Sequence, residues 1–171
     1  MVQAASRTEG DIRSTPDILV ATISRVEQCR RDVAPLLAGP LVVLGCGSSY
    51  CVALAGAALS EAHHHLPAQA VPASDYQPRP DWTHLAISRT GQTTELVAAM
   101  RRAKAAGARV VLLVGEPGSP AAAYADVCLP LEFAPEQGII QTRFVSAALL
   151  ALRLLIGGAV AQQVNGLLAQ P

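Results

Sequence analysis

The sequence predicts an α/β fold, with a doubly wound five-stranded parallel sheet and helices on both of its faces. Short apolar runs that do not alternate with polar residues, such as residues 41–44 and 109–114, are typical of strands buried on both faces. Longer segments with helical periodicity lie between these runs, which indicates parallel strands joined by helical crossovers. The expected strand order is 2-1-3-4-5, so the first and third strands are neighbours and the chain reverses direction between them.

The N-terminal part of the chain is expected to hold one long helix before the first strand. Residues 1–16 are polar, and we expect this leader to be extended or partly ordered. Apolar residues recur at helical spacing from Asp17, and Gly39-Pro40 ends that helix. The first strand then covers residues 41–44, and an alanine-rich helix covers residues 50–64.

The remaining elements continue the alternation of strand and helix. A helix is expected at residues 93–106, because Glu95 in its first turn, basic residues near its end and Gly107 beyond it match the helix dipole and the usual glycine stop. The other elements are a weak strand at 68–71, a strand at 83–87, a strand at 109–114, a short alanine-rich helix, a strand at 126–131, a long helix at 142–156 and a short helix in the last dozen residues.

Length and composition favour one domain with a small ligand. The 171 residues are enough for a buried core, and we expect residues 39–171 to form the domain, with residues 1–38, the leader and first helix, packed on it. Thirteen basic and thirteen acidic residues leave a net charge of zero, and aromatic residues make up only 4%. That balance disfavours nucleic acid as a partner.

The sequence gives no sign of a membrane or an oxidising compartment. Charged residues interrupt the N-terminal segment, and Arg153 interrupts the longest apolar stretch, residues 144–160. The four cysteines have neither zinc-site spacing nor the density of a disulfide framework. We therefore expect a cytoplasmic protein with no membrane partner.

Two hydroxyl-rich loops carry most of the functional information. Residues 45–50 (GCGSSY) follow the first predicted strand, and residues 88–93 (SRTGQT) follow the third. Each loop precedes a helix, and a helix start offers unpaired N–H groups and a partial positive charge to an anion. The two loops lie at neighbouring strand ends and predict a cradle for a phosphate and its attached polyol.

Other readings of these loops are weaker. A dinucleotide fingerprint would need a third glycine near Tyr50, and a nucleotide-triphosphate loop would need a following lysine; both are missing. Ordinary helix capping by Thr93 or Thr94 would explain one hydroxyl of the second loop but not the others.

Three segments together resemble the SIS (sugar isomerase) domain family. They are residues 45–50 (GCGSSY), 88–93 (SRTGQT) and 136–143 (EQGIIQTR), and the pair Asp11-Ile12 before Pro16 resembles the family's opening. The similarity covers residues 9–157 and is greatest to the first SIS domain of glucosamine-6-phosphate synthase and related aminosugar isomerase/deaminase proteins. The resemblance implies a flavodoxin-like fold and a phosphosugar site.

The resemblance also assigns roles to individual residues. By position, the first loop would line the sugar, the second loop would hold the phosphate, and the third segment would close the rim. These residues are Gly47, Ser48 and Ser49 for the sugar, Ser88, Arg89, Thr90 and Thr93 for the phosphate, and Ile139 and Gln141 for the rim.

This sequence departs from the family at three positions. Arg89 replaces a neutral polar residue and adds a fixed charge with a bidentate fork. Gln141 and Arg143 replace a serine and a lysine, so the rim would recognise a different sugar.

Sugar isomerisation needs a carboxylate base near the substrate. In the tandem-domain relatives that base lies in a second domain, which we do not expect within these 171 residues. Among Glu61, Glu136 and His84, we expect Glu61 to lie on a helix surface and His84 in the core. Glu136 lies in the third segment of the family resemblance, at the lip of the expected crevice, and is the candidate base, with a group from a partner chain as the alternative.

No metal or cofactor is expected. Residues 63–65 are three consecutive histidines, which point to different faces of a helix and lack further ligands at useful spacing. Cys46 could be a nucleophile at a helix start, but we favour a packing role, because the resembling family often has a small residue there.

We expect a homodimer or higher homo-oligomer that binds a sugar phosphate, either an aminosugar or a ketose phosphate, and catalyses its isomerisation, with or without deamination. The alternative is a non-catalytic sugar-phosphate sensor or one half of a split tandem-SIS enzyme.

Overall fold

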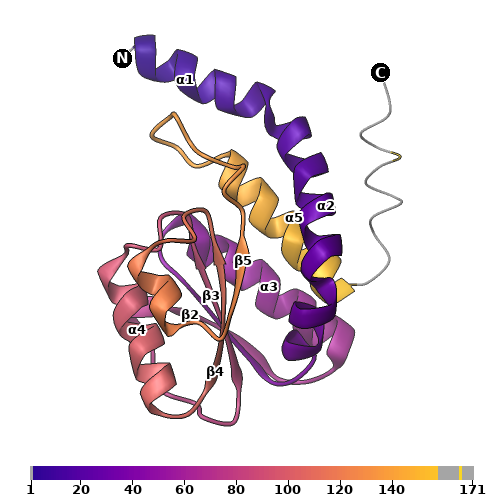
Figure 1. The fold of residues 1–171 in the computed structure, drawn as a ribbon, viewed down its shortest axis with the longest axis vertical. Coiled ribbons are helices and arrows are strands. Elements are labelled where there is room, and N and C mark those ends of the chain that lie inside the picture. Colours follow the sequence, from indigo (N-terminus) through magenta and orange to yellow (C-terminus); the bar gives the residue numbers. More distant parts are fainter. Residues whose placement is uncertain (1, 158–165, 167–171) are drawn as a thin grey trace.

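The computed structural model describes residues 2–157 and residue 166, and these form a three-layer α/β arrangement (Figure 1). Parallel strands form one sheet in the order β2-β1-β3-β4-β5, which confirms the predicted fold class and strand order. The strands are β1 (Leu41–Gly45), β2 (Ala68–Pro72), β3 (Thr83–Ser88), β4 (Arg109–Val114) and β5 (Val127–Pro130).

Helices cover both faces of this sheet. The α-helices are α1 (Val2–Arg13), α2 (Thr15–Val33), α3 (Ser48–His64), α4 (Thr94–Ala105) and α5 (Arg143–Gly157). Helices α2, α3 and α5 pack together on one face, and α4 covers the other. Helix α1 extends beyond the sheet, and the loop between β5 and α5 lies beneath it in Figure 1.

The apolar strands are buried between the two helical layers. In β1, Leu41 and Val43 belong to the core formed with α2, α3 and α5, whereas Val42 and Leu44 belong to the core formed with α4. Both faces of the strand need apolar side chains, which is why the sequence shows continuous runs and no alternation.

The prediction of an extended leader was wrong. Residues 2–13 form helix α1, and α2 begins at Thr15 with Pro16 in its first turn, where a missing N–H breaks no helical bond. The contacts of α1 are largely polar: Glu9 and Arg13 form an ion pair of 2.7 Å one turn apart, and Asp11 is fully buried against the loop before α5. Such a helix contains few apolar side chains, so it gives only a weak signal of an element packed on a core in the sequence.

Two smaller differences concern helix type and coverage. The short helix predicted after β4 is a 3-10 helix at Pro120–Tyr124, and further 3-10 turns occur at Ala34–Leu37 and Ala73–Asp75. The helix predicted for the last dozen residues falls on a segment of which only residue 166 is described. Within the described part of the chain, none of the helices has the length and hydropathy that a membrane crossing requires.

His84 is a core residue of β3, as predicted. Its Nε2 lies 2.9 Å from the Tyr76 hydroxyl oxygen, and its Nδ1 lies 3.0 Å from the carbonyl oxygen of Trp82. A neutral imidazole that donates from Nδ1 and accepts at Nε2 satisfies both partners. Burial lowers the pKa of His84 below its ordinary value, because the core cannot solvate an imidazolium.

His84 therefore predicts a loss of stability in mild acid. The unfolded chain binds a proton at this residue near pH 6.5, about its ordinary pKa, and the folded chain does so only at lower pH. The free energy of unfolding should fall as the pH drops from about 7 to 5. Urea denaturation of the wild type and of His84→Gln checks this: the variant should show a smaller change over that range, and an equal change would contradict it.

Candidate functional site

The two predicted loops meet at the carboxyl ends of β1 and β3 and enclose a cavity of about 200 Å³. The first loop, the second loop with the first turn of α4, and the segment before α5 all contribute to its walls. The lining residues are Cys46, Ser49, Ile87, Ser88, Arg89, Thr90, Thr93, Leu96 and Gln141. Six predicted site residues are among them: Ser49, Ser88, Arg89, Thr90, Thr93 and Gln141.

The other four predicted site residues do not line this cavity. Gly47 and Ser48 are exposed at the start of α3, and Ile139 is 88% exposed on the outer side of its loop. Glu136 is half-buried near the start of α5, where its carboxylate is hydrogen-bonded to backbone N–H groups. The sequence also missed Ile87 and Leu96, since buried apolar residues carry no signal of a ligand.

Close backbone packing shapes the first loop. A Cβ atom on Gly45 would lie 2.5 Å from the carbonyl oxygen of Ser49 and 2.7 Å from the Tyr50 nitrogen. Gly47 adopts φ of +54°, which favours glycine, and its carbonyl oxygen accepts the N–H of Tyr50 at 3.0 Å. These contacts start α3 directly after β1 and turn the buried Ser49 toward the cavity.

The second loop is held by its own side chains and by the turn after β4. Ser88 Oγ accepts the N–H of Gly91 at 2.9 Å, and Gly91 adopts φ of +62°. The N–H of Gly115 donates to the carbonyl oxygens of Ser88 (3.3 Å) and Arg89 (3.0 Å), and the N–H of Ala121 donates to that of Gly91 (3.0 Å). The loop is thus fixed before any ligand binds.

Thr93 occupies the N-cap position of α4, but its side chain makes no capping hydrogen bond. Capping was the structural alternative to a binding role for this hydroxyl. Thr93 lines the cavity instead, where its hydroxyl can donate a hydrogen bond to an oxyanion.

Two residues that line the cavity each carry a buried polar atom with no hydrogen-bond partner among the described residues. These atoms are Nε of Arg89, which is a charged donor, and Oε1 of Gln141, which is an acceptor. Buried polar atoms are normally hydrogen-bonded, and leaving one unpaired costs about 1–3 kcal/mol. A ligand with an anionic oxygen and a hydroxyl group would satisfy both atoms.

Cys46 lacks the properties of an activated nucleophile. Burial raises the pKa of its thiol above the ordinary value, so the thiol form is favoured near neutral pH. Among the described residues there is also no group of three or more histidine, cysteine and acidic side chains that could hold a metal ion. In the histidine run, His63 Nε2 lies 2.8 Å from an Arg153 nitrogen.

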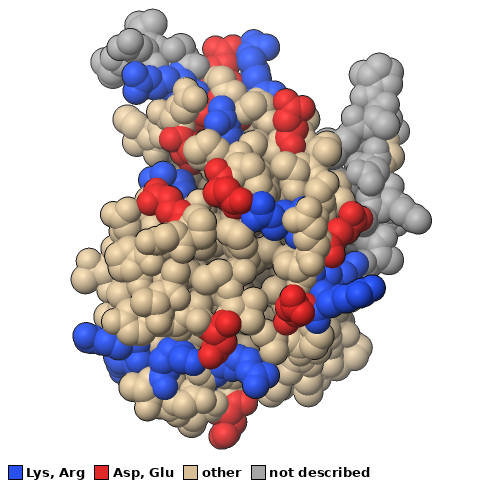
Figure 2. Space-filling model, in the orientation of Figure 1, with Lys and Arg blue, Asp and Glu red and all other residues tan. Residues whose placement is uncertain are grey.

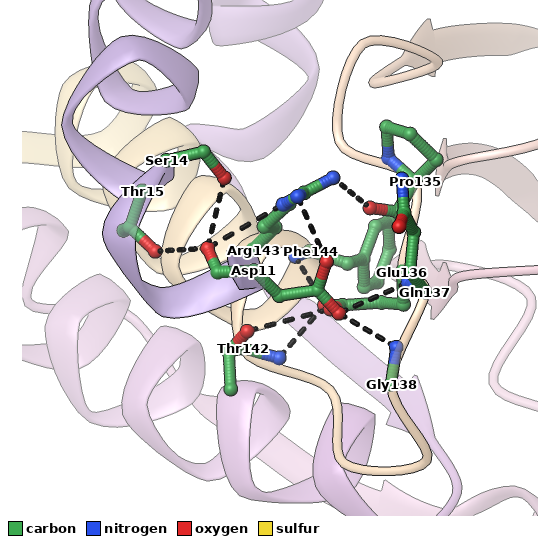
Figure 3. Close-up of polar contacts among 10 residues, drawn as sticks. All are labelled: Asp11, Ser14, Thr15, Pro135, Glu136, Gln137, Gly138, Thr142, Arg143 and Phe144. Carbon is green, nitrogen blue, oxygen red and sulfur yellow. Dashed lines mark hydrogen bonds and ion pairs between the residues drawn. The ribbon is translucent and has the colours of Figure 1, made fainter. Parts of the chain in front are cut away.

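Glu136 has a structural contact that the sequence did not indicate. Its Oε1 accepts the backbone N–H groups of Thr142 (2.7 Å) and Phe144 (2.8 Å), at the start of α5 (Figure 3). Helix starts leave such N–H groups unpaired, and a carboxylate there also interacts favourably with the helix dipole. Its catalytic role stays a prediction.

Asp11 is a polar residue near the site to which the sequence analysis assigned no role. It is fully buried, lies 2.8 Å from an Arg143 guanidinium nitrogen, and accepts the N–H of Gly138 at 2.7 Å. Its position in the Asp11-Ile12 pair, part of the family's opening, was the available signal.

A larger cavity of about 420 Å³ lies at the opposite end of the sheet, at the starts of β3 and β4. Lys104 and Arg109 contribute to its lining, and blue side chains gather along the lower part of α4 in Figure 2. Lys104 already pairs with Asp126 at 2.5 Å, and none of the lining residues carries an unpartnered buried atom of the kind found at Arg89. The smaller cavity is therefore the candidate site.

A family model described as SIS domain matches residues 38–157. The chain belongs to the SIS domain family. All three predicted segments lie within the matched residues, and each of them contributes to the lining of the cavity described above.

Curated relatives of this SIS domain are much longer proteins. A glutamine–fructose-6-phosphate aminotransferase (isomerizing) from Rhizobium meliloti is 28% identical over 163 residues, which cover 88% of this chain and 27% of that protein. The Halobacterium salinarum protein of the same name is 35% identical over 124 residues, or 67% of this chain and 21% of the relative. The chain thus spans about a quarter or less of their length.

Solved structures show the same fold. Tagatose-6-phosphate ketose/aldose isomerase from Escherichia coli has a TM-score of 0.77 at 19% identity, covering 97% of this chain and 53% of that one. The C-terminal domain of glucosamine-fructose-6-phosphate aminotransferase from Francisella tularensis has a TM-score of 0.75 at 18% identity, covering 92% and 50%. This SIS domain therefore corresponds to about half of each solved chain.

Proposed function

We propose that this SIS domain binds a sugar phosphate in the 200 Å³ cavity, with the phosphate on residues 88–93 and the sugar toward Ser49 and Gln141. The observation that carries this proposal is the pair of unpartnered buried atoms, Arg89 Nε and Gln141 Oε1, in one polar cavity. A phosphate oxygen suits the guanidinium N–H, and a sugar hydroxyl suits the amide oxygen. The names of the relatives, which act on fructose 6-phosphate and tagatose 6-phosphate, support the same ligand class.

Isomerisation of the bound sugar phosphate, with or without deamination, belongs to the proposal. The base would be Glu136 or a group from a second chain. The Glu136 carboxylate is bonded to Thr142 and Phe144 and does not line the cavity, so it would have to exchange those bonds for contact with a sugar carbon. A second chain could instead supply the base in a homodimer or larger assembly.

A second candidate function is non-catalytic: a sugar-phosphate sensor, or one half of a split enzyme. The share of the solved structures that this domain covers favours this function, because the domain corresponds to only 50% of the Francisella tularensis chain and 53% of the Escherichia coli chain. A cytoplasmic location fits both functions, since all four cysteines are free.

Calorimetric titration with fructose 6-phosphate and glucosamine 6-phosphate tests the binding function, with unphosphorylated fructose as the matched control. Binding of a phosphorylated sugar without binding of fructose is the expected result. If none of the phosphorylated sugars bound at millimolar concentration, the proposal would be wrong.

Product analysis of the same mixtures separates the two functions. Interconversion of the sugar phosphates that is lost in Glu136→Gln supports an enzyme with this residue as base. Turnover that survives in Glu136→Gln assigns the base to another group. Binding without turnover supports the sensor or split-enzyme function.

Thr93→Val tests the phosphate end of the site without disturbing the fold. Because the hydroxyl caps nothing, the free energy of unfolding should change by less than about 0.5 kcal/mol. Loss of one hydrogen bond to phosphate should weaken sugar-phosphate binding by about 1 kcal/mol, or roughly fivefold. Urea denaturation measures the free energy of unfolding, and calorimetry measures the affinity for the sugar phosphate. A destabilised variant with unchanged affinity would show that Thr93 caps the helix and does not bind the ligand.

A further inference from the structure

The rim loop, residues 132–142 between β5 and α5, contains neither helix nor strand, yet it places Gln141 in the cavity wall. Its outer side carries Ile139 and Ile140, which are 88% and 65% exposed. Ala134 near its start is buried in the core, but the exposed part around Ile139 and Ile140 needs polar contacts to hold one position. Arg25 pairs with Glu132 at the start of the loop, and Glu136 bonds Thr142 at its end. The contacts of its middle are made by Asp11 of α1.

Asp11 bonds the middle of the rim loop. Its Oδ2 accepts the backbone N–H groups of Gln137 at 2.9 Å and Gly138 at 2.7 Å (Figure 3). Gly138 lies directly on α1, since a Cβ atom there would be 2.5 Å from the Thr8 hydroxyl oxygen. The side chain of Asp11 is completely shielded from solvent, so these are charge-assisted hydrogen bonds in a poorly hydrated environment.

The same carboxylate forms an ion pair with Arg143, directly after the rim loop. Oδ1 of Asp11 lies 2.8 Å from a terminal guanidinium nitrogen of Arg143, the first residue of α5. Arg143 also donates to the carbonyl oxygen of Pro135 at 3.0 Å, near the start of the loop. Asp11 is thus linked to the start, the middle and the end of the segment that carries Gln141.

The phosphate loop has separate supports. Residues 88–93 are bonded to the turn after β4 through Gly115 and Ala121, whereas the hydrogen bonds and ion pair of the Asp11 carboxylate go to Gln137, Gly138 and Arg143. Loss of Asp11 should therefore change the rim and leave the phosphate loop in place.

We propose that Asp11 is a positioning residue that holds the rim loop so that Gln141 meets the sugar of the bound ligand. The inference rests on the proposed function, because it assigns Gln141 to the sugar end of that site. It also gives α1, which the sequence presents as a polar leader, a part in ligand selection.

Asp11→Asn in the full chain tests the inference. The amide has nearly the same size, but it loses the charge opposite Arg143 and turns an NH₂ group toward a donor, either Arg143 or the N–H groups of the rim loop. Glu9→Gln is the matched control, since Glu9 is an exposed carboxylate of the same helix that pairs with the exposed Arg13 and not with the rim loop among the described residues.

Calorimetry with two probes separates positioning from general damage. Asp11→Asn should bind fructose 6-phosphate at least tenfold more weakly than the wild type and bind inorganic phosphate within twofold of it. Hydrogen–deuterium exchange should increase in residues 132–142 and stay unchanged in residues 83–93. Glu9→Gln should match the wild type in every measurement.

Three results would overturn the inference: unchanged affinity for fructose 6-phosphate, an equal loss for both probes, or unchanged exchange in the rim loop. Failure of the proposed function looks different, because the wild type itself would then not bind fructose 6-phosphate. The exchange measurement does not depend on a ligand and still decides whether Asp11 holds the loop.

Discussion

Replacement of Gly45 by alanine should lower the free energy of unfolding by about 3 kcal/mol. The new Cβ would lie 2.5–2.7 Å from backbone atoms of Ser49 and Tyr50, and backbone in the first turn of α3 cannot move as a flexible side-chain tip can. Because Ser49 lines the cavity, the same displacement should weaken sugar-phosphate binding. Urea denaturation and calorimetry give the two quantities.

Gly118→Ala is the matched control for Gly45→Ala. A Cβ atom on Gly118 would meet nothing within 4 Å, so this variant should change the stability by no more than about 1 kcal/mol in either direction. A Gly45→Ala protein as stable as Gly118→Ala would mean that the turn from β1 into α3 is looser than described.

Arg89→Met should weaken sugar-phosphate binding by about 1.5–3 kcal/mol, or roughly 10- to 100-fold, without destabilising the free protein. In the free protein Nε of Arg89 is buried and has no partner among the described residues, so its removal breaks no hydrogen bond at that atom. With ligand bound, the guanidinium would donate to phosphate, and this charge-assisted bond is lost in the variant.

The contrast between a large loss of affinity and an unchanged stability makes the Arg89 test specific. Arg101→Met removes an exposed arginine of α4 that does not line the cavity and should leave both quantities unchanged. Calorimetry measures the affinity, and urea denaturation measures the stability. A variant that binds normally, or that loses 2 kcal/mol or more of stability, would show that Arg89 is a structural residue.

The sequence predicted the sheet and the two loops because their signals are local. Residues 41–44 and 109–114 are apolar without alternation, and each forms a strand covered on both faces. The order β2-β1-β3-β4-β5 follows from right-handed crossovers between such strands, so Ser49 and Thr90 come together at neighbouring strand ends.

The sequence did not reveal which residues of each motif face inward. Ser48 and Ser49 are adjacent hydroxyls at the start of α3, yet only Ser49 is buried at the cavity, because the helix turns its successive side chains about 100° apart. The motif alone gave both the same role.

Long-range polar contacts were equally hidden. Asp11 and Arg143 are separated by most of the chain, and their pairing depends on how α1 lies over the rim loop. Glu136 occurs in a family segment, but its bonds to Thr142 and Phe144 depend on where α5 begins. No periodicity or composition encodes such contacts, so they emerge only from the folded chain.

A crystal structure of the full chain with fructose 6-phosphate tests the binding site most directly. The account predicts the phosphate within hydrogen-bond distance of Arg89 Nε and the hydroxyls of Thr90 and Thr93, with a sugar hydroxyl on Gln141 Oε1. A sugar phosphate found instead beside Lys104 and Arg109, in the 420 Å³ cavity at the other end of the sheet, would contradict it.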